Sequence, residues 1–379
     1  MYKIKVMILM ICVLPLIVIG CDIKNGDSSI SGTSSRTSSG TSSDIDSGKN
    51  LKVGMAYRDY FPIGVAIRTT TISRFSTLIK QQFGSVTAEN AMKPEPLHPE
   101  RNRYFFTDAD TIVDFAKNND LLVRGHTLIW HNQTPAWMFR GASGSTATRE
   151  ELMAVTEDHI KTVVGRYKGR VYCWDVVNEA VSDSSNEYLR NTPYLKIIGE
   201  DYIKLAFKWA HEADPDALLF YNDYSTENPA KRDKIIRLVK SLLDEGIPIN
   251  GIGLQCHYNI YSTPLEELER SIKLFSEMGL LIHVTELDMS IYSNSENNLK
   301  FDTLPEDRKV LQIDKYTRVM KILRDNRDKV SSVSFWGLSD NLSWLNDFPV
   351  KGRNDWPLLY DKNLHQKECM NAIMNFDND

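Results

Sequence analysis

Three observations predict a closed (β/α)8 barrel. Eight short apolar segments recur along the chain from Leu51 onward, and segments with a helical period lie between them. No glycine-rich phosphate loop follows the first apolar segment, which argues against a doubly wound sheet. Polar side chains gather directly after the apolar segments, as they do at the carboxyl-terminal face of a barrel.

The apolar segments are rich in β-branched and aromatic residues and have the length of buried parallel strands. A single α/β barrel of this chain length is common, so we expect one catalytic domain over residues 51–379, without a second domain or an internal repeat. The eight predicted strands are Ile63–Ile67, Ser85–Ala88, Leu121–His126, Val171–Asn178, Ala217–Tyr221, Gly251–Gln255, Leu281–Thr285 and Val330–Phe335.

Two of the helices between these strands carry start signals. Thr148 with Glu151, and Thr263 with Glu266, have the spacing of capping boxes, and Pro264 suits a first helical turn. Apolar faces with a helical period follow both signals, through Leu152, Val155, His159 and Val163 in one helix and Leu265, Leu268, Ile272 and Phe275 in the other.

Residues 1–20 are typical of an export signal. Two lysines precede an apolar run from Val6 to Ile19 that is short for a membrane span. The run closes on Val-Ile-Gly-Cys21, which resembles a bacterial lipoprotein signal and implies cleavage before Cys21 and lipidation of its thiol. An ordinary secretory signal and an anchor helix are the alternatives. We expect an exported lipoprotein, anchored to a membrane at the cell surface or in the periplasm.

Residues 21–50 are predicted to be a flexible linker. Ser, Gly and Thr dominate this segment, so it cannot bury enough apolar surface to offset its ordering entropy. Such a linker would hold the catalytic domain away from the membrane.

Composition excludes several classes of partner. A net charge of −5 gives no reason to expect a nucleic-acid partner. Outside the signal, Cys173, Cys256 and Cys369 fit neither a zinc site nor a disulfide framework, and we expect no metal and no organic cofactor. The chain has 7 Trp, a content that suits stacking on sugar rings.

Two of the predicted strands end in a glutamate. Asn178-Glu179 closes one, and Glu286 closes another with Asp288 two residues later. In a barrel both glutamates face one cleft, and a pair of carboxyls is what hydrolysis of a glycosidic bond requires. Apolar neighbours around Glu179 favour the protonated form and suit an acid. His257 could bridge to Asp288 and keep Glu286 ionised, as a nucleophile requires.

Five motifs in barrel order resemble the family-ten glycoside hydrolases, the endo-β-1,4-xylanases. The resemblance extends from about Ile63 to Asp361, essentially the whole predicted domain. The motifs are Glu89-Asn-x-Met-Lys93, Gly125-His-Thr-Leu-x-Trp-His131, Trp174-Asp-Val-Val-Asn-Glu179, Thr285-Glu-Leu-Asp288 and Phe335-Trp-Gly-Leu338.

The resemblance implies Glu179 as general acid/base and Glu286 as nucleophile, with retention of configuration. His257, Asp288 and Gln255 are expected to support the nucleophile. It also implies a cis peptide between His126 and Thr127. The expected substrate-binding residues are Glu89, Asn90, Lys93, His126, Trp130, Gln133, Asn178 at the 2-hydroxyl, Tyr224 in an aglycone subsite, Trp336 and Trp344, whereas Trp137 and Trp174 are left out.

Xylan is the expected substrate because xylose lacks the hydroxymethyl group of glucose. A sugar site closed by Trp336, Trp344 and Gln133 would accept xylose and clash with glucose. One extra carbon discriminates by only about 1–3 kcal/mol, so a side activity on cello-oligosaccharides is expected. We expect a monomer that acts on xylan, arabinoxylan and xylo-oligosaccharides.

Two alternatives remain at this point. A cellulase or mannanase on the same barrel would also use an Asn-Glu pair, although the strand-two and strand-three motifs argue against it. A non-catalytic, glycan-binding lipoprotein would explain the tryptophans, but it gives no reason for two glutamates.

Overall fold

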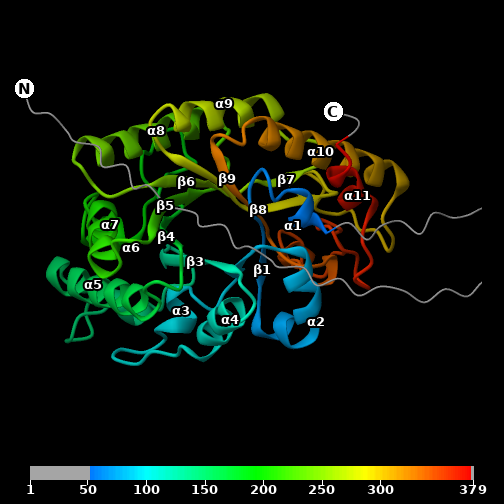
Figure 1. Ribbon diagram of the computed structural model, residues 1–379. Coiled ribbons are helices and arrows are strands. Elements are labelled where there is room, and N and C mark those ends of the chain that lie inside the picture. Colours follow the sequence, from blue (N-terminus) through cyan, green and yellow to red (C-terminus); the bar gives the residue numbers. More distant parts are fainter. Residues whose placement is uncertain (1–51, 377–379) are drawn as a thin grey trace, which may run out of the picture. The chain divides into compact units, whose positions relative to one another are not determined.

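The computed structural model describes residues 52–376 of the chain (Figure 1). Their parallel strands pair in the order β6-β5-β4-β3-β2-β1-β9-β8, and β6 also pairs with β8, so the sheet closes on itself. This closure confirms the predicted (β/α)8 barrel. Its strands are β1 Ile63–Ile67, β2 Ser85–Ala88, β3 Leu122–Ile129, β4 Cys173–Asn178, β5 Leu218–Asp223, β6 Gly251–Leu254, β8 Leu281–Ser290 and β9 Val330–Phe335.

The predicted export signal, the linker and the lipidation site Cys21 lie outside the described residues. Within those residues, no helix combines the length and apolar character needed to cross a membrane.

An additional strand, β7, covers His257–Asn259 directly after β6 and was not predicted. It pairs in parallel with β8, and the register sets His257 opposite Asp288. Because β7 pairs with Asp288, Met289 and Ser290, β8 continues to Ser290, beyond its pairing with β6 and β9. Glu286 therefore lies within a strand, and the predicted strand end at Thr285 is wrong.

Strand β3 also runs beyond its predicted end, to Ile129. The peptide between His126 and Thr127 is cis, as the resemblance implies. The pairing register of β3 with β4 shifts directly after His126. Strand ends depend on pairing with neighbours, which the local sequence does not show.

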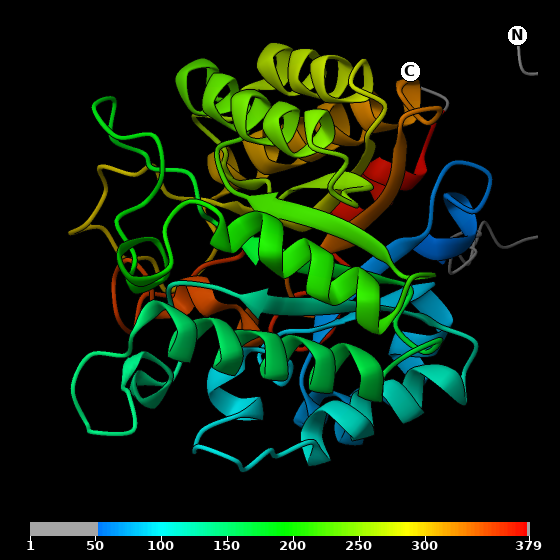
Figure 2. The ribbon, with the colours of Figure 1, turned by 90° about the vertical axis from the view of Figure 1, so that its left-hand side faces the viewer.

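Helices surround the barrel (Figures 1 and 2). They connect each strand to the next and return the chain to the amino-terminal side of the sheet, as parallel pairing requires. The helices are α1 Val53–Ala56, α2 Thr69–Gln82, α3 Pro94–Leu97, α4 Thr107–Lys117, α5 Arg149–Arg166, α6 Pro193–Ile197, α7 Tyr202–Ala213, α8 Pro229–Asp244, α9 Leu265–Ser276, α10 Glu306–Asp325 and α11 Glu368–Met374, with short 3-10 turns at Ala136–Phe139, Asp340–Leu342 and Trp344–Asn346.

Only one of the two predicted capping boxes forms. At α5, the Thr148 hydroxyl accepts from the Glu151 backbone N–H, and the Glu151 carboxylate accepts from the Thr148 N–H. At α9 the box is absent, since the helix begins at Leu265 with Pro264 as N-cap. The Thr263 hydroxyl donates instead to the carbonyl oxygen of Asn259. Asn259 is the last residue of β7, the strand that was not predicted.

Close packing in the core explains one residue of the strand-three motif. Trp174 on β4 is fully buried against Gly125 on β3, where an added Cβ would lie 2.1 Å from the indole. Gly125 is therefore required by the close approach of a side chain. Cys173, Cys256 and Cys369 are buried free thiols, and Cys256 lies between β6 and β7.

Candidate active site

The carboxyl ends of the strands open into a cleft of about 820 Å³. All ten predicted substrate-binding residues line it, together with Glu179, Glu286, Gln255 and His257. Asp288 lies behind His257 and contacts it. The cleft is also lined by residues that were not predicted, namely Arg68, His131, Asn132, Arg190, Ser225, Asn294 and Phe348.

One end of the cleft is a set of polar side chains that are already paired. Arg68 clamps the Glu89 carboxylate with two hydrogen bonds, of 2.7 and 2.5 Å. Lys93 Nζ donates to Asn90 Oδ1 at 3.0 Å and to Gln133 Oε1 at 2.9 Å, and burial lowers the Lys93 pKa. These bonds fix donors and acceptors in place for sugar hydroxyls before a substrate binds.

Glu286 is held by a row of hydrogen bonds that includes a charged histidine, His257. Its Oε2 lies 3.2 Å from His257 Nε2, and His257 Nδ1 lies 3.0 Å from Asp288 Oδ1. The other Asp288 oxygen accepts from Trp344 Nε1 at 2.8 Å. The bridge predicted from the sequence is therefore present, and it extends to a tryptophan of the sugar site.

The electrostatics of this chain favour an ionised Glu286. Burial alone would raise its pKa, but His126 and His257 outweigh burial, and the net pKa is lowered. For His257, burial would lower the pKa, but Asp288 and Glu286 outweigh it and raise the pKa to about 10. His257 thus carries a proton at neutral pH and donates to both carboxylates.

His126 is held in place by Asp175, which forms a buried ion pair with Arg124. Asp175 accepts from His126 Nδ1 at 2.9 Å and from Arg124 Nε at 3.0 Å. His126 Nδ1 also lies 4.0 Å from Glu286 Oε1. Asp175 belongs to the strand-four motif, and its contacts show that this part of the motif orients a residue of strand three.

Glu179 leaves β4 with an unusual backbone. Its φ is +57°, a left-handed conformation that a glutamate rarely adopts, and its N–H donates to the Asn222 carbonyl oxygen at 2.9 Å. Such strain concentrates at functional sites. Here the turn points the carboxyl into the cleft.

The Glu179 carboxyl is surrounded by neutral N–H donors. Trp130 Nε1 donates to Oε2 at 2.8 Å, and Gln255 Nε2 donates to Oε1 at 2.9 Å. Asn178 Nδ2 lies 3.3 Å from the same Oε1. His131 Nε2 is 4.0 Å from Oε2, and burial lowers the His131 pKa.

Gln255, expected to support the nucleophile, contacts both carboxyl residues of the site. Its side chain donates to Glu179 and, at 3.2 Å, to Asn178 Oδ1. Towards Glu286 it offers only its backbone carbonyl oxygen, which accepts from the Glu286 N–H at 3.1 Å. The strand ends at Leu254, and the turn before β7 directs the Gln255 side chain towards β4.

Asn222 is a central residue that the sequence analysis missed. Its Nδ2 lies 2.8 Å from Glu286 Oε1 and 2.9 Å from Asn178 Oδ1, and its Oδ1 accepts from Thr285. It therefore joins the two halves of the site. Its position in the polar segment Tyr221-Asn-Asp-Tyr224 at the end of strand five was the available signal.

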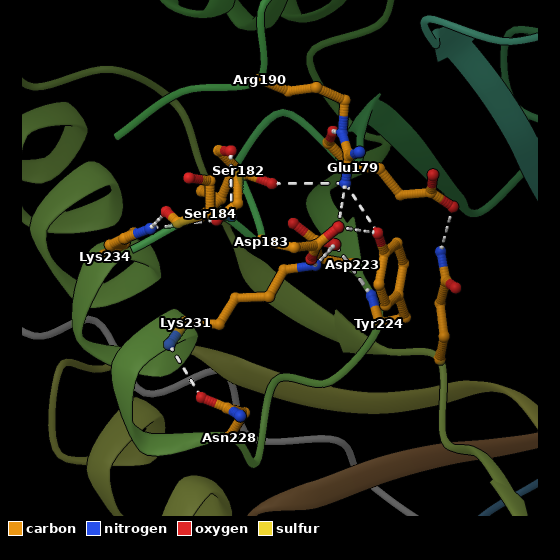
Figure 3. Close-up of polar contacts among 12 residues, drawn as sticks. Glu179, Ser182, Asp183, Ser184, Arg190, Asp223, Tyr224, Asn228, Lys231 and Lys234 are labelled. Carbon is orange, nitrogen blue, oxygen red and sulfur yellow. Dashed lines mark hydrogen bonds and ion pairs between the residues drawn. The ribbon is translucent and has the colours of Figure 1, made fainter. Parts of the chain in front are cut away.

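A network of charges on the loops after β4 and β5 holds the backbone of Glu179 (Figure 3). Arg190 donates to the Glu179 carbonyl oxygen at 3.0 Å and to the Tyr224 hydroxyl at 2.7 Å. The Tyr224 hydroxyl donates in turn to Asp183. Lys231 Nζ lies 2.8 Å from Asp183, 2.8 Å from buried Asp223 and 3.4 Å from the centre of the Tyr224 ring. Tyr224 is thus linked to the acid/base candidate.

Within residues 52–376, no group of three or more His, Cys, Asp or Glu side chains is arranged to hold a metal ion. Three glutamates line the cleft, and because Glu89 is paired with Arg68, Glu179 and Glu286 are the two candidates for the chemistry.

A (β/α)8 barrel with two buried carboxyls in a polar and aromatic cleft defines a glycoside hydrolase. The family model described as glycosyl hydrolase family 10 matches residues 52–376. The chain belongs to this family.

Relatives of known function support the assignment. A β-1,4-xylanase of Dictyoglomus thermophilum is 49% identical over 84% of this chain and 89% of its own length. Endo-1,4-beta-xylanase B of Paenibacillus barcinonensis is 45% identical over 85% of this chain and 97% of its own length. The crystal structure of the Paenibacillus barcinonensis xylanase XynB with a conduramine derivative superposes with a TM-score of 0.84 at 44% identity, covering 88% of this chain and 99% of that chain. A mutant structure in complex with xylotriose superposes with a TM-score of 0.83 at 39% identity, covering 86% of this chain and 100% of that chain.

Proposed function

We propose that the protein is a retaining endo-β-1,4-xylanase that hydrolyses internal bonds of xylan. The observation that carries the proposal is the contrast between the two carboxyls of the cleft. Glu286 is bound to a protonated histidine, which suits a nucleophile, and Glu179 is bound to neutral donors, which suits a group that gains and loses a proton.

The reaction has two steps. In the first, Glu286 attacks the anomeric carbon, the bond to the leaving-group oxygen breaks, and Glu179 gives that oxygen its proton. In the second, Glu179 takes a proton from water, whose oxygen displaces Glu286 from the anomeric carbon. The two inversions restore the starting configuration.

Asn178 is the proposed partner of the 2-hydroxyl in both steps. Its Nδ2 lies beside Glu179, and its Oδ1 is held by Asn222 and Gln255. A bond to the 2-hydroxyl strengthens as the sugar approaches an oxocarbenium-like transition state.

Xylan as substrate is supported by similarity to the named xylanases and by the xylotriose bound in one similar structure. Trp336, Trp344 and Gln133 line the cleft. We expect kcat/KM to favour xylo-oligosaccharides over cello-oligosaccharides by about an order of magnitude or more, within the 10–200-fold range that one carbon provides.

Product analysis tests the activity. Early digests of polymeric xylan should contain a ladder of oligomers, whereas release of a single small product would mean exo action. Parallel digests of cellulose and mannan should be slower, and equal rates would overturn the choice of xylan. Proton NMR of the first product should show the β-anomer, while an α-anomer would mean inversion.

Glu286→Ala separates catalysis from glycan binding. The variant should bind xylan and fail to hydrolyse it. Hydrolysis by this variant at the wild-type rate would exclude the proposed mechanism.

The proposed location rests on residues 1–50 of the sequence alone. A lipid on Cys21 would anchor an exported, monomeric enzyme through the Ser-rich linker. Expression with a radiolabelled fatty acid should label the wild type and not Cys21→Ser, and the variant should leave the membrane fraction. Light scattering of the soluble domain should give one chain per particle.

A further inference from the structure

Arg68 lines the catalytic cleft and was not predicted from the sequence. It is the first residue after β1, as Glu89 is the first residue after β2. The two strands pair in parallel, with Ile67 opposite Ala88, so the residues that follow them emerge side by side. Arg68 is therefore the side chain that β1 contributes to the carboxyl-terminal face of the barrel.

The Glu89 carboxylate uses only part of its hydrogen-bonding capacity on Arg68. Arg68 Nε donates to Oε2 at 2.7 Å and Nη2 donates to Oε1 at 2.5 Å, so each carboxylate oxygen accepts one bond from the guanidinium. An ionised carboxylate has about four acceptor sites, which leaves a second site on each oxygen for a sugar hydroxyl. The paired bonds fix the plane of the carboxylate and hence the direction of these free sites.

The guanidinium also keeps donors of its own. An arginine side chain has more N–H groups than the clamp on Glu89 uses. Among residues 52–376, no group accepts a hydrogen bond from Arg68 Nη1. The Arg68 side chain is 42% exposed and the Glu89 side chain 10%, so the part of this pair that reaches the open cleft belongs mainly to Arg68.

Electrostatic interactions indicate the order of these residues along the cleft. Burial lowers the Lys93 pKa, and the two catalytic carboxyls and Glu89 oppose that change. Arg68 affects the Lys93 pKa less than any of these three carboxyls does. Lys93 therefore lies between the catalytic pair and Glu89, and Arg68 lies beyond Glu89.

The position of β1 in the barrel shows which end of the cleft this is. Tyr224 follows β5 and Arg68 follows β1, and these strands lie on opposite sides of the barrel. Since Tyr224 is expected in an aglycone subsite, Arg68 belongs to the glycone end, where the sugars that stay on Glu286 bind.

We propose that Arg68 binds the third sugar of the glycone end, counted from the bond that is cleaved, and thereby helps to select that bond. Nη1 donates to a hydroxyl of this sugar, while Nε and Nη2 hold Glu89 in place for the second sugar. A xylan chain that reaches Arg68 gains a bond that a chain with two glycone sugars lacks. The inference deepens the proposed function and rests on it, because it needs a xylan chain in the cleft.

Aryl xylosides measure the third sugar alone. A nitrophenyl xylobioside and a nitrophenyl xylotrioside carry the same leaving group, and nitrophenolate is released only when all of their sugars occupy the glycone end. The ratio of kcat/KM for the trioside to kcat/KM for the bioside is the contribution of the third sugar. For the wild type this ratio should be about tenfold, the equivalent of one hydrogen bond from a charged donor.

Arg68→Lys should bring this ratio close to one. Lysine keeps a charge beside Glu89, so kcat/KM for the bioside should fall by a smaller factor than kcat/KM for the trioside. Its compact ammonium lacks the fork that serves Glu89 and a sugar together. Arg74→Met is the matched control, because Arg74 is exposed on α2, the helix that follows Arg68, and contacts the Phe75 ring. Arg74 does not line the cleft, so this variant should keep the tenfold ratio.

The outcomes distinguish the role of Arg68 from the proposed function. No hydrolysis of polymeric xylan by the wild type would overturn the proposed function itself. Hydrolysis of xylan with a wild-type ratio near one would overturn the role of Arg68 alone. An equal fall for the two substrates in Arg68→Lys would mean that Arg68 acts only through Glu89, and this too would overturn the role. Loss of the ratio in Arg74→Met would assign the effect to the order of α2, with the same consequence.

If Arg68→Lys fails to fold, modified substrates test the wild type instead. Three triosides, whose terminal xylose lacks the hydroxyl at C2, C3 or C4, remove the acceptors of Arg68 one at a time. At least one of them should have the kcat/KM of the bioside. Retention of the full trioside value by all three would exclude a hydrogen bond to the third sugar.

Discussion

The surroundings of Glu286 and Glu179 differ in charge, although both carboxyls face one cleft and Asn222 and Asn178 connect them. Glu286 ends a row of hydrogen bonds that runs through His257 to Asp288, and His257 carries a proton at neutral pH. Glu179 is met by an indole and two amides, which are neutral. The difference shows that one barrel can assign two carboxyl groups different catalytic roles through their hydrogen-bond partners.

The largest expected effect is the loss of activity in variants of the two glutamates, and substrates with different leaving groups should distinguish the two variants. Glu286→Ala should abolish turnover of both xylan and a dinitrophenyl xylobioside, because no nucleophile remains. Glu179→Ala should slow xylan hydrolysis about 10²–10⁴-fold, the contribution of acid/base catalysis. It should retain a rapid burst of dinitrophenolate, since that leaving group needs no proton. Stopped-flow absorbance measures the burst, and a burst in Glu286→Ala would reverse the assignment.

Asp288→Asn should alter the pH profile. In the folded protein the His257 pKa is about 10, above its ordinary 6.5, so His257 stays charged at neutral pH. The contribution of this charge to stability is complete below pH 6.5 and is lost as pH rises through 10. Asp288 is the main group that raises this pKa. Its removal should move the alkaline limb of kcat/KM down by about one unit or more, consistent with a charged hydrogen bond of about 1.5–3 kcal/mol.

Neutral His257 can donate to one carboxylate only, so its deprotonation deprives Glu286 of a donor. Asp355→Asn is the control, because Asp355 is also buried at the end of β8 but contacts Ser290 and Ile291. It should leave the alkaline limb in place. An unchanged limb in Asp288→Asn would disprove the charged chain.

Gln255→Ala should affect mainly the acid/base side, because Glu179 loses a donor whereas Asn178 keeps its bond to Asn222. Loss of its bonds to Glu179 and Asn178 should lower kcat/KM on xylan about tenfold, or about 1.4 kcal/mol. The burst rate with the dinitrophenyl substrate should change less. If both substrates lost the same factor, Gln255 would act on the nucleophile after all.

The smallest effect is expected at Arg190. Arg190→Met removes the bonds to the Glu179 carbonyl oxygen and to Tyr224, so KM for xylohexaose should rise about threefold to tenfold, the equivalent of one hydrogen bond. An aryl xylobioside, which places no sugar near Tyr224, should change little. Lys234→Met is the control, since Lys234 tethers the same loop through the carbonyl oxygens of Ser182, Ser184 and Glu187. A similar rise in that variant would indicate loop order alone.

Much of the site could be predicted because the change from an apolar run to polar residues is visible in the chain. Apolar runs that stop at Glu179 and at Glu286 identify two carboxyls at one face of a barrel. The contact of His257 with Asp288 could be predicted from chemistry, since a nucleophilic Glu286 must be ionised and a histidine held by a carboxylate keeps it so. The side of the cleft that Gln255 serves did not follow, because a one-residue change at a strand end turns a side chain to the other neighbour.

Other residues were missed for the same reason. Asn222 and Arg190 are ordinary polar residues in sequence, and their roles come from partners on other strands and loops. The failed capping box at Thr263 has a similar cause, since the Thr263 hydroxyl donates to Asn259 of β7, a strand that was not predicted.

The sequence by itself determined the barrel, the two carboxyls and most residues of the cleft, because apolar periodicity and the polar residues that follow each apolar run are local properties. Tertiary structure alone decided which carboxyl receives a charged partner and where β8 ends. These features depend on pairing and burial between distant segments, and pairing and burial set the electrostatics on which the chemistry depends.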